Sequence, residues 1–149
     1  SAFSIASIIA SAAGLDIPDT MQVRAVRSLV RGTAKDLPTD ARVQIADGQP
    51  GRAIRTGRWK YAVHVPDEHG TNQPSYDTYH ETHLYDLLYD PHELTNLVAA
   101  ESHAIVRDAC RQRLLNRMAD AGEPTPTIVQ PAELWPKFQR EVTPEEAAA

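Results

Sequence analysis

Apolar residues recur along this chain with two different periods, and each period predicts a type of element. Over residues 3–13, isoleucines and alanines recur at helical spacing, and Gly14 supplies a helix stop. A second short helix is expected over 21–30. From position 42 the period changes to two, because Val43 and Ile45 alternate with polar residues. The pattern therefore predicts a short helical segment followed by the first strand of a sheet.

Two further runs, 52–56 and 58–65, surround a Thr-Gly pair and predict a hairpin. Alternate positions of the second run are large and apolar, so its inner face is expected to be core; these positions are Trp59, Tyr61, Val63 and Val65. Residues 66–81 are polar and contain Gly and Pro, which predicts a long loop. Residues 84–88 give a fourth strand, and the segment that follows, capped by Asp90 and Glu93, is expected to form a helical turn over 94–97.

The longest predicted helix covers residues 102–121. Its apolar residues Val106, Cys110, Leu114 and Met118 recur every four positions, and Gly122 ends it. The remaining residues, 123–149, contain five prolines and are expected to lie extended over the surface, held by Trp135 and Phe138.

These elements predict an α+β fold, in which a small antiparallel sheet of about four strands has a long helix packed on one face. A short N-terminal helical segment and a proline-rich C-terminal tail complete it. We place the boundaries at 1–32 for the helical linker segment, 33–122 for the sheet and long helix, and 123–149 for the tail.

Composition and charge exclude several classes of function. A chain of 149 residues fits one ordinary domain, and a net charge of -5 argues against nucleic acid as a partner. No apolar run approaches the roughly 20 residues that a membrane span needs. The single cysteine, Cys110, excludes a disulfide within the chain and a multi-cysteine zinc site. We expect a soluble protein, and the sequence does not decide between the cytoplasm and export.

Three segments, in this order, carry a family resemblance: SIASIIASAAGLDIPDTMQVRAVRSLVRG (4–32), GRAIRTGRWKYAV (51–63) and HLYDLLYDPHELTNLVAAESHAIVRDACRQRLLNRM (83–118). They resemble the linker helix, the hairpin and the strand-turn-helix of the C-terminal subdomain of the sulfatase family, in the alkaline-phosphatase-like superfamily. Val23 stands where that family usually has glycine, and residues 25–26 depart from its usual Ser-Leu pair.

The resemblance implies a hydrolase of sulfuric esters, but it places the chemistry elsewhere. Such enzymes use a formylglycine made from a Cys or Ser in a C/S-x-P-x-R motif, beside a calcium ion held by Asp and Asn. Cys110 is followed by Arg-Gln-Arg and lies on the apolar stripe of a helix, so we expect a buried hydrophobe. We therefore predict no catalytic residue, no metal site and no cofactor in this chain; calcium and formylglycine would belong to a catalytic domain outside it. This chain alone is expected to be inactive.

The resemblance also suggests where substrate would be touched, because loops of this subdomain help to select the alcohol part of the ester. The substrate-contact candidates are polar and aromatic residues of the predicted long loop and its flanks: His64, His69, Tyr76, Tyr79 and His80.

Two more specific interpretations, a metal site and a sulfate-binding site, are less favoured. A metal site at His80 and His83 is disfavoured, because an extended chain points residues three apart to opposite faces. The basic residues Arg52, Arg55, Arg58 and Lys60 could clamp a sulfate, but alternation favours a solvated face opposite Trp59.

Two hypotheses about partners remain. In the first, the chain completes the fold of a sulfatase catalytic domain and shapes its substrate pocket. In the second, it is a freestanding interaction or oligomerisation module that binds a second copy through the apolar face of Ile5, Ile8 and Ile9.

Overall fold

The computed structural model describes residues 9–10, 12–16, 32, 39–45, 48–66, 68 and 73–130. The chain divides into two units, Ser1–Pro38 and Thr39–Ala149. In the first unit, residues 9–10 and 12 are helical, and Gly14 follows with a φ of 72°. The Leu15 N–H donates to the Ala10 carbonyl at 2.9 Å. This left-handed glycine ends the helix as predicted; the rest of that helix and the one expected over 21–30 lie outside the described residues.

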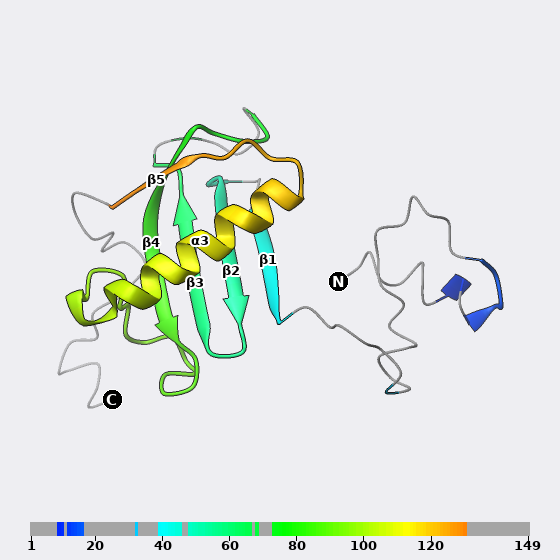
Figure 1. Ribbon diagram of the computed structural model, residues 1–149, viewed down its shortest axis with the longest axis horizontal. Coiled ribbons are helices and arrows are strands. Elements are labelled where there is room, and N and C mark those ends of the chain that lie inside the picture. Colours follow the sequence, from blue (N-terminus) through cyan, green and yellow to red (C-terminus); the bar gives the residue numbers. More distant parts are fainter. Residues whose placement is uncertain are drawn as a thin grey trace, which may run out of the picture. The chain divides into compact units, whose positions relative to one another are not determined.

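The second unit is built on one sheet with the strand order β1-β2-β3-β4-β5 (Figure 1). The strands are β1 (Asp40–Ile45), β2 (Gly51–Thr56), β3 (Trp59–His64), β4 (Thr78–Asp86) and β5 (Thr127–Val129). The first four are antiparallel neighbours, whereas β5 pairs parallel to β4, with Thr127 opposite Thr78. The α+β class is confirmed, but the sheet is mixed and has five strands, because the beginning of the predicted tail joins its edge.

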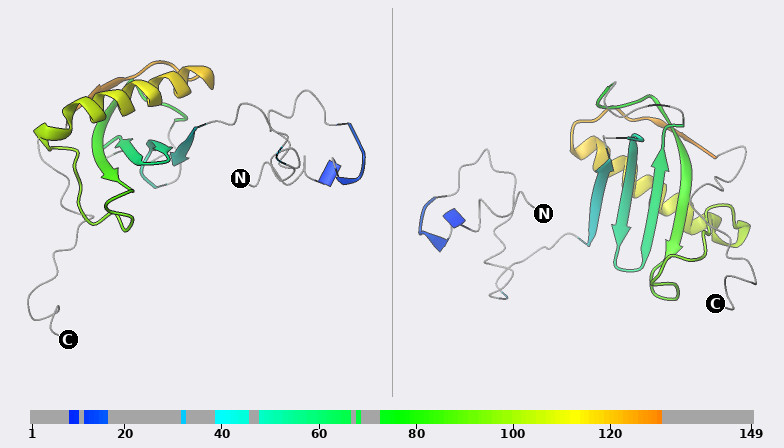
Figure 2. Two further views of the ribbon diagram at one scale, coloured as in Figure 1. Left: turned by 60° about the horizontal axis from the view of Figure 1, so that its bottom comes forward. Right: turned by 180° about the vertical axis from the view of Figure 1, so that it is seen from behind.

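One helix covers one face of this sheet. A single 3-10 turn, η1 (Glu101–His103), leads into α3 (Ala104–Asp120), which crosses the strands in front while the opposite face carries no described helix (Figures 1 and 2). The predicted apolar stripe is confirmed, since Cys110, Leu114 and Met118 are buried against the sheet. They pack with Ile54, Tyr61 and Leu84, none of which is exposed to solvent, and this layer is the core.

Strand β4 is longer than predicted and begins inside the expected loop. Residues 78–81 belong to the strand, and its regular pairing ends at Asp86, so residues 87–89 form a turn. The prediction was wrong because the run Tyr-His-Glu-Thr-His is polar, and burial of Glu81 depends on partners from α3. The helical turn expected over 94–97 is also absent; Asp90 instead accepts hydrogen bonds from the Leu94 and Thr95 N–H groups at 3.0 and 2.8 Å.

A β-bulge at Thr82 changes which residues share a face. On β3, Ala62 lies opposite His83 and His64 lies opposite His80, while Thr82 has no opposite residue. The Thr82 hydroxyl donates to the Ala62 carbonyl at 3.0 Å. Because Ala62 and His64 are two residues apart, their partners His80 and His83 also lie on one face. The extra residue in the bulge reverses the alternation that the sequence predicts.

The hairpin of β2 and β3 forms as expected, and Tyr61 is fully buried, but Arg52 does not lie on a solvated face. Arg52 is opposite Val63 in the register, on the side of the sheet that α3 covers, and is 2% exposed. Its guanidinium donates to the carbonyls of Gly51 and Pro74 at 3.0 and 2.7 Å and to Glu123 at 2.9 Å. The buried charge is thereby paired, which the strand pattern alone does not reveal.

Candidate functional site

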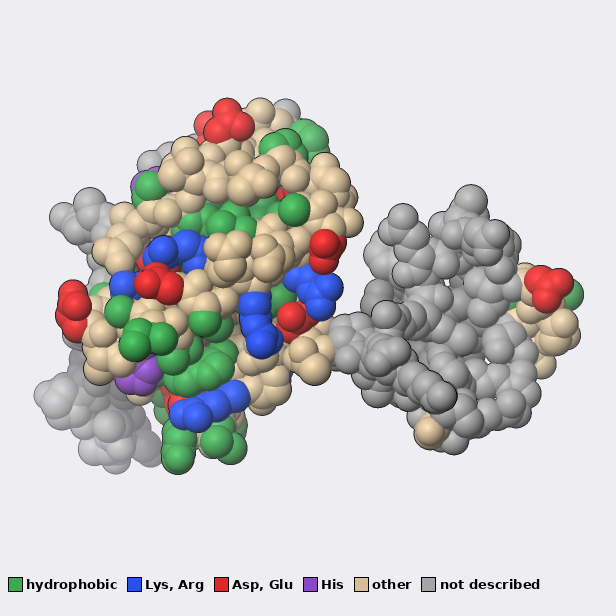
Figure 3. Space-filling view, in the orientation of Figure 1, with side chains coloured by type: hydrophobic (Ala, Val, Ile, Leu, Met, Phe, Trp, Pro, Cys, Tyr) green, Lys and Arg blue, Asp and Glu red, His purple; other side chains and the backbone are tan. Residues whose placement is uncertain are grey.

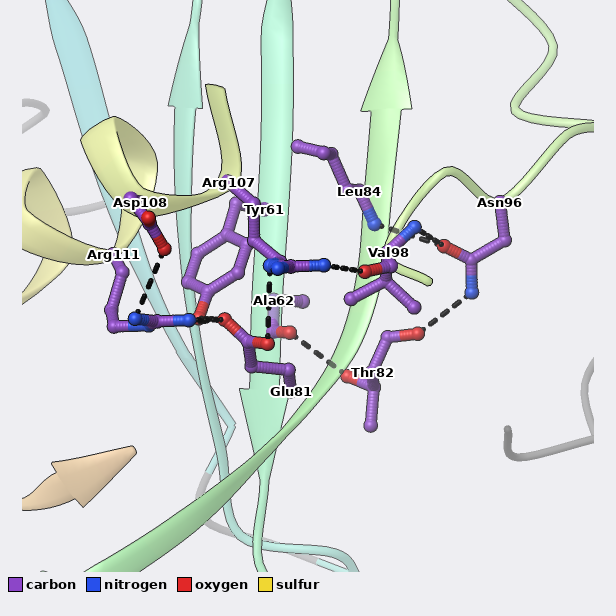
Figure 4. A network of polar contacts seen from close by, with 10 residues as sticks. All are labelled: Tyr61, Ala62, Glu81, Thr82, Leu84, Asn96, Val98, Arg107, Asp108 and Arg111. Carbon is purple, nitrogen blue, oxygen red and sulfur yellow. Dashed lines mark hydrogen bonds and ion pairs between the residues drawn. The ribbon is translucent and has the colours of Figure 1, made fainter. Parts of the chain in front are cut away.

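A buried carboxylate joins the sheet to the helix (Figure 4). Glu81 of β4 has no exposed surface and accepts hydrogen bonds from the Tyr61 hydroxyl at 2.7 Å and from Arg111 of α3 at 2.7 and 3.1 Å. The Nε of Arg107 lies 3.6 Å from its other oxygen. Burial raises the pKa of Tyr61 well above its usual range, and the hydrogen bond to Glu81 adds to this. Tyr61 and Arg111 bind one oxygen of Glu81, while its other oxygen and the Arg107 Nε are buried without a hydrogen-bond partner among the described residues. The cluster ties α3 to the sheet.

The connection from β4 to α3 is fixed by Asn96. Its side chain accepts hydrogen bonds from the Leu84 and Val98 N–H groups at 3.0 and 3.1 Å and donates to the Thr82 carbonyl at 2.7 Å (Figure 4). Arg107 also donates to the Val98 carbonyl at 2.7 Å. The Leu97 N–H also donates to the Leu84 carbonyl at 2.8 Å, so these bonds tie the segment after β4 back to the strand.

The helix-covered side of the second unit carries charges that neutralise one another. Arg117 donates to the nearly buried Asp40 at 2.8 Å, and Arg113 lies 3.9 Å from the same carboxylate. Figure 3 shows basic and acidic side chains next to one another on this side. A shallow hollow of about 450 Å³ between α3 and β1 is lined by these residues. Since each arginine faces a carboxylate, this hollow is a poor anion site.

The predicted substrate contacts do not gather in one place. Tyr76 and Tyr79 lie together, with an edge-to-face contact at 6.4 Å, and Tyr79 is fully buried on the helix side beneath Arg52, 5.7 Å from its ring. His64 and His80 face each other across β3 and β4 on the opposite side of the sheet. His64 is 8% exposed, and His80 is half-buried. His69 lies outside the described residues.

The sheet face opposite α3 also holds a hollow, and sequence reasoning missed it. The cavity measures about 530 Å³. Its lining runs across four strands and is mostly apolar; it includes Val43, Ile45, Ala53, Ala62, Thr82 and His83. Val43 and Ile45 remain 48% and 56% exposed. We call this surface, bordered by Val43 and Ile45 and floored by Ala53 and Ala62, the open face.

His83 borders the open face and is shaped by its neighbours. Its ring stacks on Tyr85 with a centroid separation of 5.6 Å, and the Lys60 ammonium lies 5.9 Å from the Tyr85 ring. Burial lowers the pKa of His83, Lys60 lowers it further, and Glu93, which pairs with Lys60 at 2.5 Å, partly offsets both. The neutral imidazole is therefore favoured, which suits an apolar surface.

The described residues include no group of three or more His, Cys, Asp or Glu side chains that could hold a metal ion. Within the same part of the chain, no helix has the length and apolar character that crossing a membrane requires.

With this geometry in place, comparison with solved structures identifies the fold. A Bacteroides thetaiotaomicron VPI-5482 protein classed as a sulfatase matches 80% of this chain with a TM-score of 0.62 and 18% identity. BT4656, solved with its substrate D-glucosamine-2-N,6-O-disulfate, matches 80% with a TM-score of 0.63 and 17% identity. The protein yidJ of Bacteroides fragilis, also classed as a sulfatase, matches 80% with a TM-score of 0.56 and 24% identity.

The matches cover this chain far better than they cover the sulfatases, of which this chain spans only 24–25%. The chain thus has the fold of one quarter of these proteins, consistent with a C-terminal subdomain, and the resemblance seen in the sequence is confirmed at the level of the fold. No family model and no curated protein matches the sequence.

Proposed function

We propose that this chain is the C-terminal subdomain of a sulfatase-type hydrolase, which completes the fold of a catalytic domain and helps to shape its substrate pocket. The observation that carries the proposal is the match of 80% of this chain to about a quarter of three sulfatases. A stretch that folds like a quarter of an enzyme needs the other three quarters for the enzyme's chemistry.

The sequence supports a catalytic centre that lies in a separate catalytic domain, outside these 149 residues. The formylglycine motif C/S-x-P-x-R does not occur in the 149 residues, and Cys110 is buried in the core. Calcium and formylglycine are therefore assigned to the catalytic domain.

The contribution to the pocket is assigned to the end of the sheet where β3 runs out and β4 begins. His80 is the contact we favour there, with His69 in the same connection. Tyr79 is fully buried, and Tyr76 and His64 are nearly so, so their part is to support this connection from within. A half-buried imidazole can donate a hydrogen bond to a sugar or aryl ester without a large rearrangement.

The competing proposal is a freestanding module that pairs with a second copy through Ile5, Ile8 and Ile9. Ile9 is 63% exposed, and Ile5 and Ile8 lie outside the described residues. In this case a tagged chain isolated from the cells that make it would contain homo-oligomers and no sulfatase catalytic sequence.

The test compares two preparations of the chain. The 149-residue chain is produced alone and assayed on 4-methylumbelliferyl sulfate with calcium and a full-length sulfatase as positive control. The tagged chain is also isolated from its own cells, and the polypeptide it belongs to or binds is identified by mass spectrometry. We expect no turnover by the chain alone and a sulfatase catalytic sequence in the isolate. Turnover by the chain alone that is lost in His80→Ala or His83→Ala would contradict the proposal.

A further inference from the structure

Strand β1 places its polar residues on the side of the sheet that α3 covers and its apolar residues on the other side, which is the reverse of the usual arrangement. Arg42 lies opposite Ile54, which is fully buried beneath α3, so Arg42 and Gln44 are on the helix side. Val43 lies opposite Ala53 and therefore points to the other side, together with Ile45. A two-layer protein with a solvated outer face places its polar residues outside and its apolar residues inside. In β1 the apolar residues point away from the only helix described in this unit.

The open face continues this apolar surface across the sheet. The residues that follow Val43 across the strands are small, because Ala53 pairs with Ala62 and Ala62 with His83. Small residues in the middle and larger ones at the rim produce the hollow of about 530 Å³. A contiguous apolar hollow on a soluble domain is typical of a surface that another structure covers.

The chemistry of the hollow favours a protein surface over a sulfated ligand. Arg52 is the one arginine among the described lining residues, and its guanidinium is bound to Gly51, Pro74 and Glu123. The hydroxyl of Thr82 is directed to the Ala62 carbonyl. A sulfate ester needs charged or well-oriented donors, whereas an apolar side-chain ridge needs only shape and the exclusion of water.

The shape of the hollow argues against a second copy as the occupant. A twofold dimer brings the same patch of both subunits together, so the patch must complement itself. Two concave surfaces facing each other would leave an empty space and lose the packing that a stable interface needs. The occupant must therefore be convex. The three matched sulfatases each have about three quarters of their length outside the match, so the catalytic domain is the occupant to which we assign this ridge.

We propose that the open face, bordered by Val43 and Ile45, is the surface on which a convex apolar ridge of a sulfatase-type catalytic domain packs. The inference rests on the proposed function and adds to it the face, the residues and the shape of the partner. It also gives the two sides of the sheet separate roles, because α3 stabilises one side and the catalytic domain covers the other.

The test uses the full chain in the cells that make it. A photo-crosslinking amino acid replaces Val43, or Ile105 as the matched control, since Ile105 is an apolar residue of α3 that is 86% exposed. The crosslinked peptides are identified by mass spectrometry. We expect position 43 to link to a sulfatase catalytic sequence, on the same polypeptide or on a separate one, and position 105 not to do so.

Charge-introducing variants give an independent measurement. Val43→Lys is combined with the crosslinker at position 45, and Ile45→Lys with the crosslinker at position 43. Each Lys should lower the crosslink yield by roughly tenfold or more, because a buried unpaired charge is costly. Ile105→Lys should leave the yield unchanged. We expect each isolated variant to fold, because Lys is well tolerated at the exposed positions of an edge strand. Thermal unfolding of the isolated variants checks this.

The remaining outcomes separate the two proposals. A sulfatase catalytic sequence in the isolate, without a link from position 43, would overturn the open-face inference and leave the proposed function standing. Links from position 43 to residues 1–38 or to a second copy would overturn the assigned occupant. An isolate that contains no sulfatase catalytic sequence would overturn the proposed function, and the inference with it.

Discussion

Removing the charge of Glu81 should destabilise the second unit more than any surface substitution. Glu81→Gln keeps the shape of the side chain but leaves Arg107 and Arg111 without their buried anion. Breaking a buried ion pair from one side costs about 3–5 kcal/mol. The Arg111 side chain is 28% exposed and that of Arg107 is 11% exposed, so water can partly solvate the two cations. We therefore expect the lower end, about 3 kcal/mol in the free energy of unfolding.

The structure offers a matched control for this change. Arg111 also pairs with Asp108 at 3.1 Å, and that carboxylate is 60% exposed. Asp108→Asn removes an ion pair with the same arginine at the surface, where such pairs contribute about 0–1 kcal/mol. Urea denaturation measures the free energy of unfolding, and thermal unfolding should show a fall in Tm of about 15 °C for Glu81→Gln. Equal losses in the two variants, or a loss below about 1 kcal/mol for Glu81→Gln, would refute the argument.

Three further predictions concern the core and the pH dependence of stability. Leu114→Ala should cost about 2–5 kcal/mol because the side chain is fully buried, and urea denaturation of this variant beside Ile105→Ala checks this. Hydrogen bonds from Arg58 lower the pKa of Asp86 below 3.8, so the folded state binds fewer protons; the stabilisation is present above about pH 4 and is lost below it. Asp86→Asn should reduce the loss of unfolding free energy that occurs as the pH falls below about 4. An unchanged loss would show that the Arg58–Asp86 pair does not contribute. The raised pKa of Tyr61 means that the folded state keeps a proton that the unfolded chain releases, so stability should fall as pH rises above 10. Tyr61→Phe should reduce this alkaline loss, and a wild-type profile that is flat above pH 10 would contradict the assignment.

Local patterns predicted the elements whose apolar residues repeat within a few positions. The four-residue spacing from Val106 to Met118 predicted α3, and the alternation from Trp59 predicted the hairpin. These signals hold because the residues that share a face are close in sequence. The N-terminal part of β4 was missed because Glu81 is buried only with Tyr61 and Arg111, which lie 20 and 30 residues away.

The candidate site was harder to predict, because it depends on how strands pair. Nothing in the sequence places Val43 opposite Ala53 rather than opposite Ile54, yet this choice decides whether Val43 points to the helix or away from it. The bulge at Thr82 is similarly invisible in a polar run. A signal was present, however: Val43 and Ile45 are apolar and share one face of β1, whereas Arg42 on the other face pairs with Glu123.

The position of Cys110 gives the chain a chemical reporter of its own opening. It is the single cysteine among 149 residues, lies between α3 and the sheet, and is 4% exposed. Burial raises the pKa of its thiol, which suppresses the reactive thiolate. A disulfide reagent such as DTNB can therefore reach the sulfur only when the helix separates from the strands. The rate of labelling under native conditions would report how often this separation occurs, and it would slow when a partner on the far side of the sheet stabilises the strands.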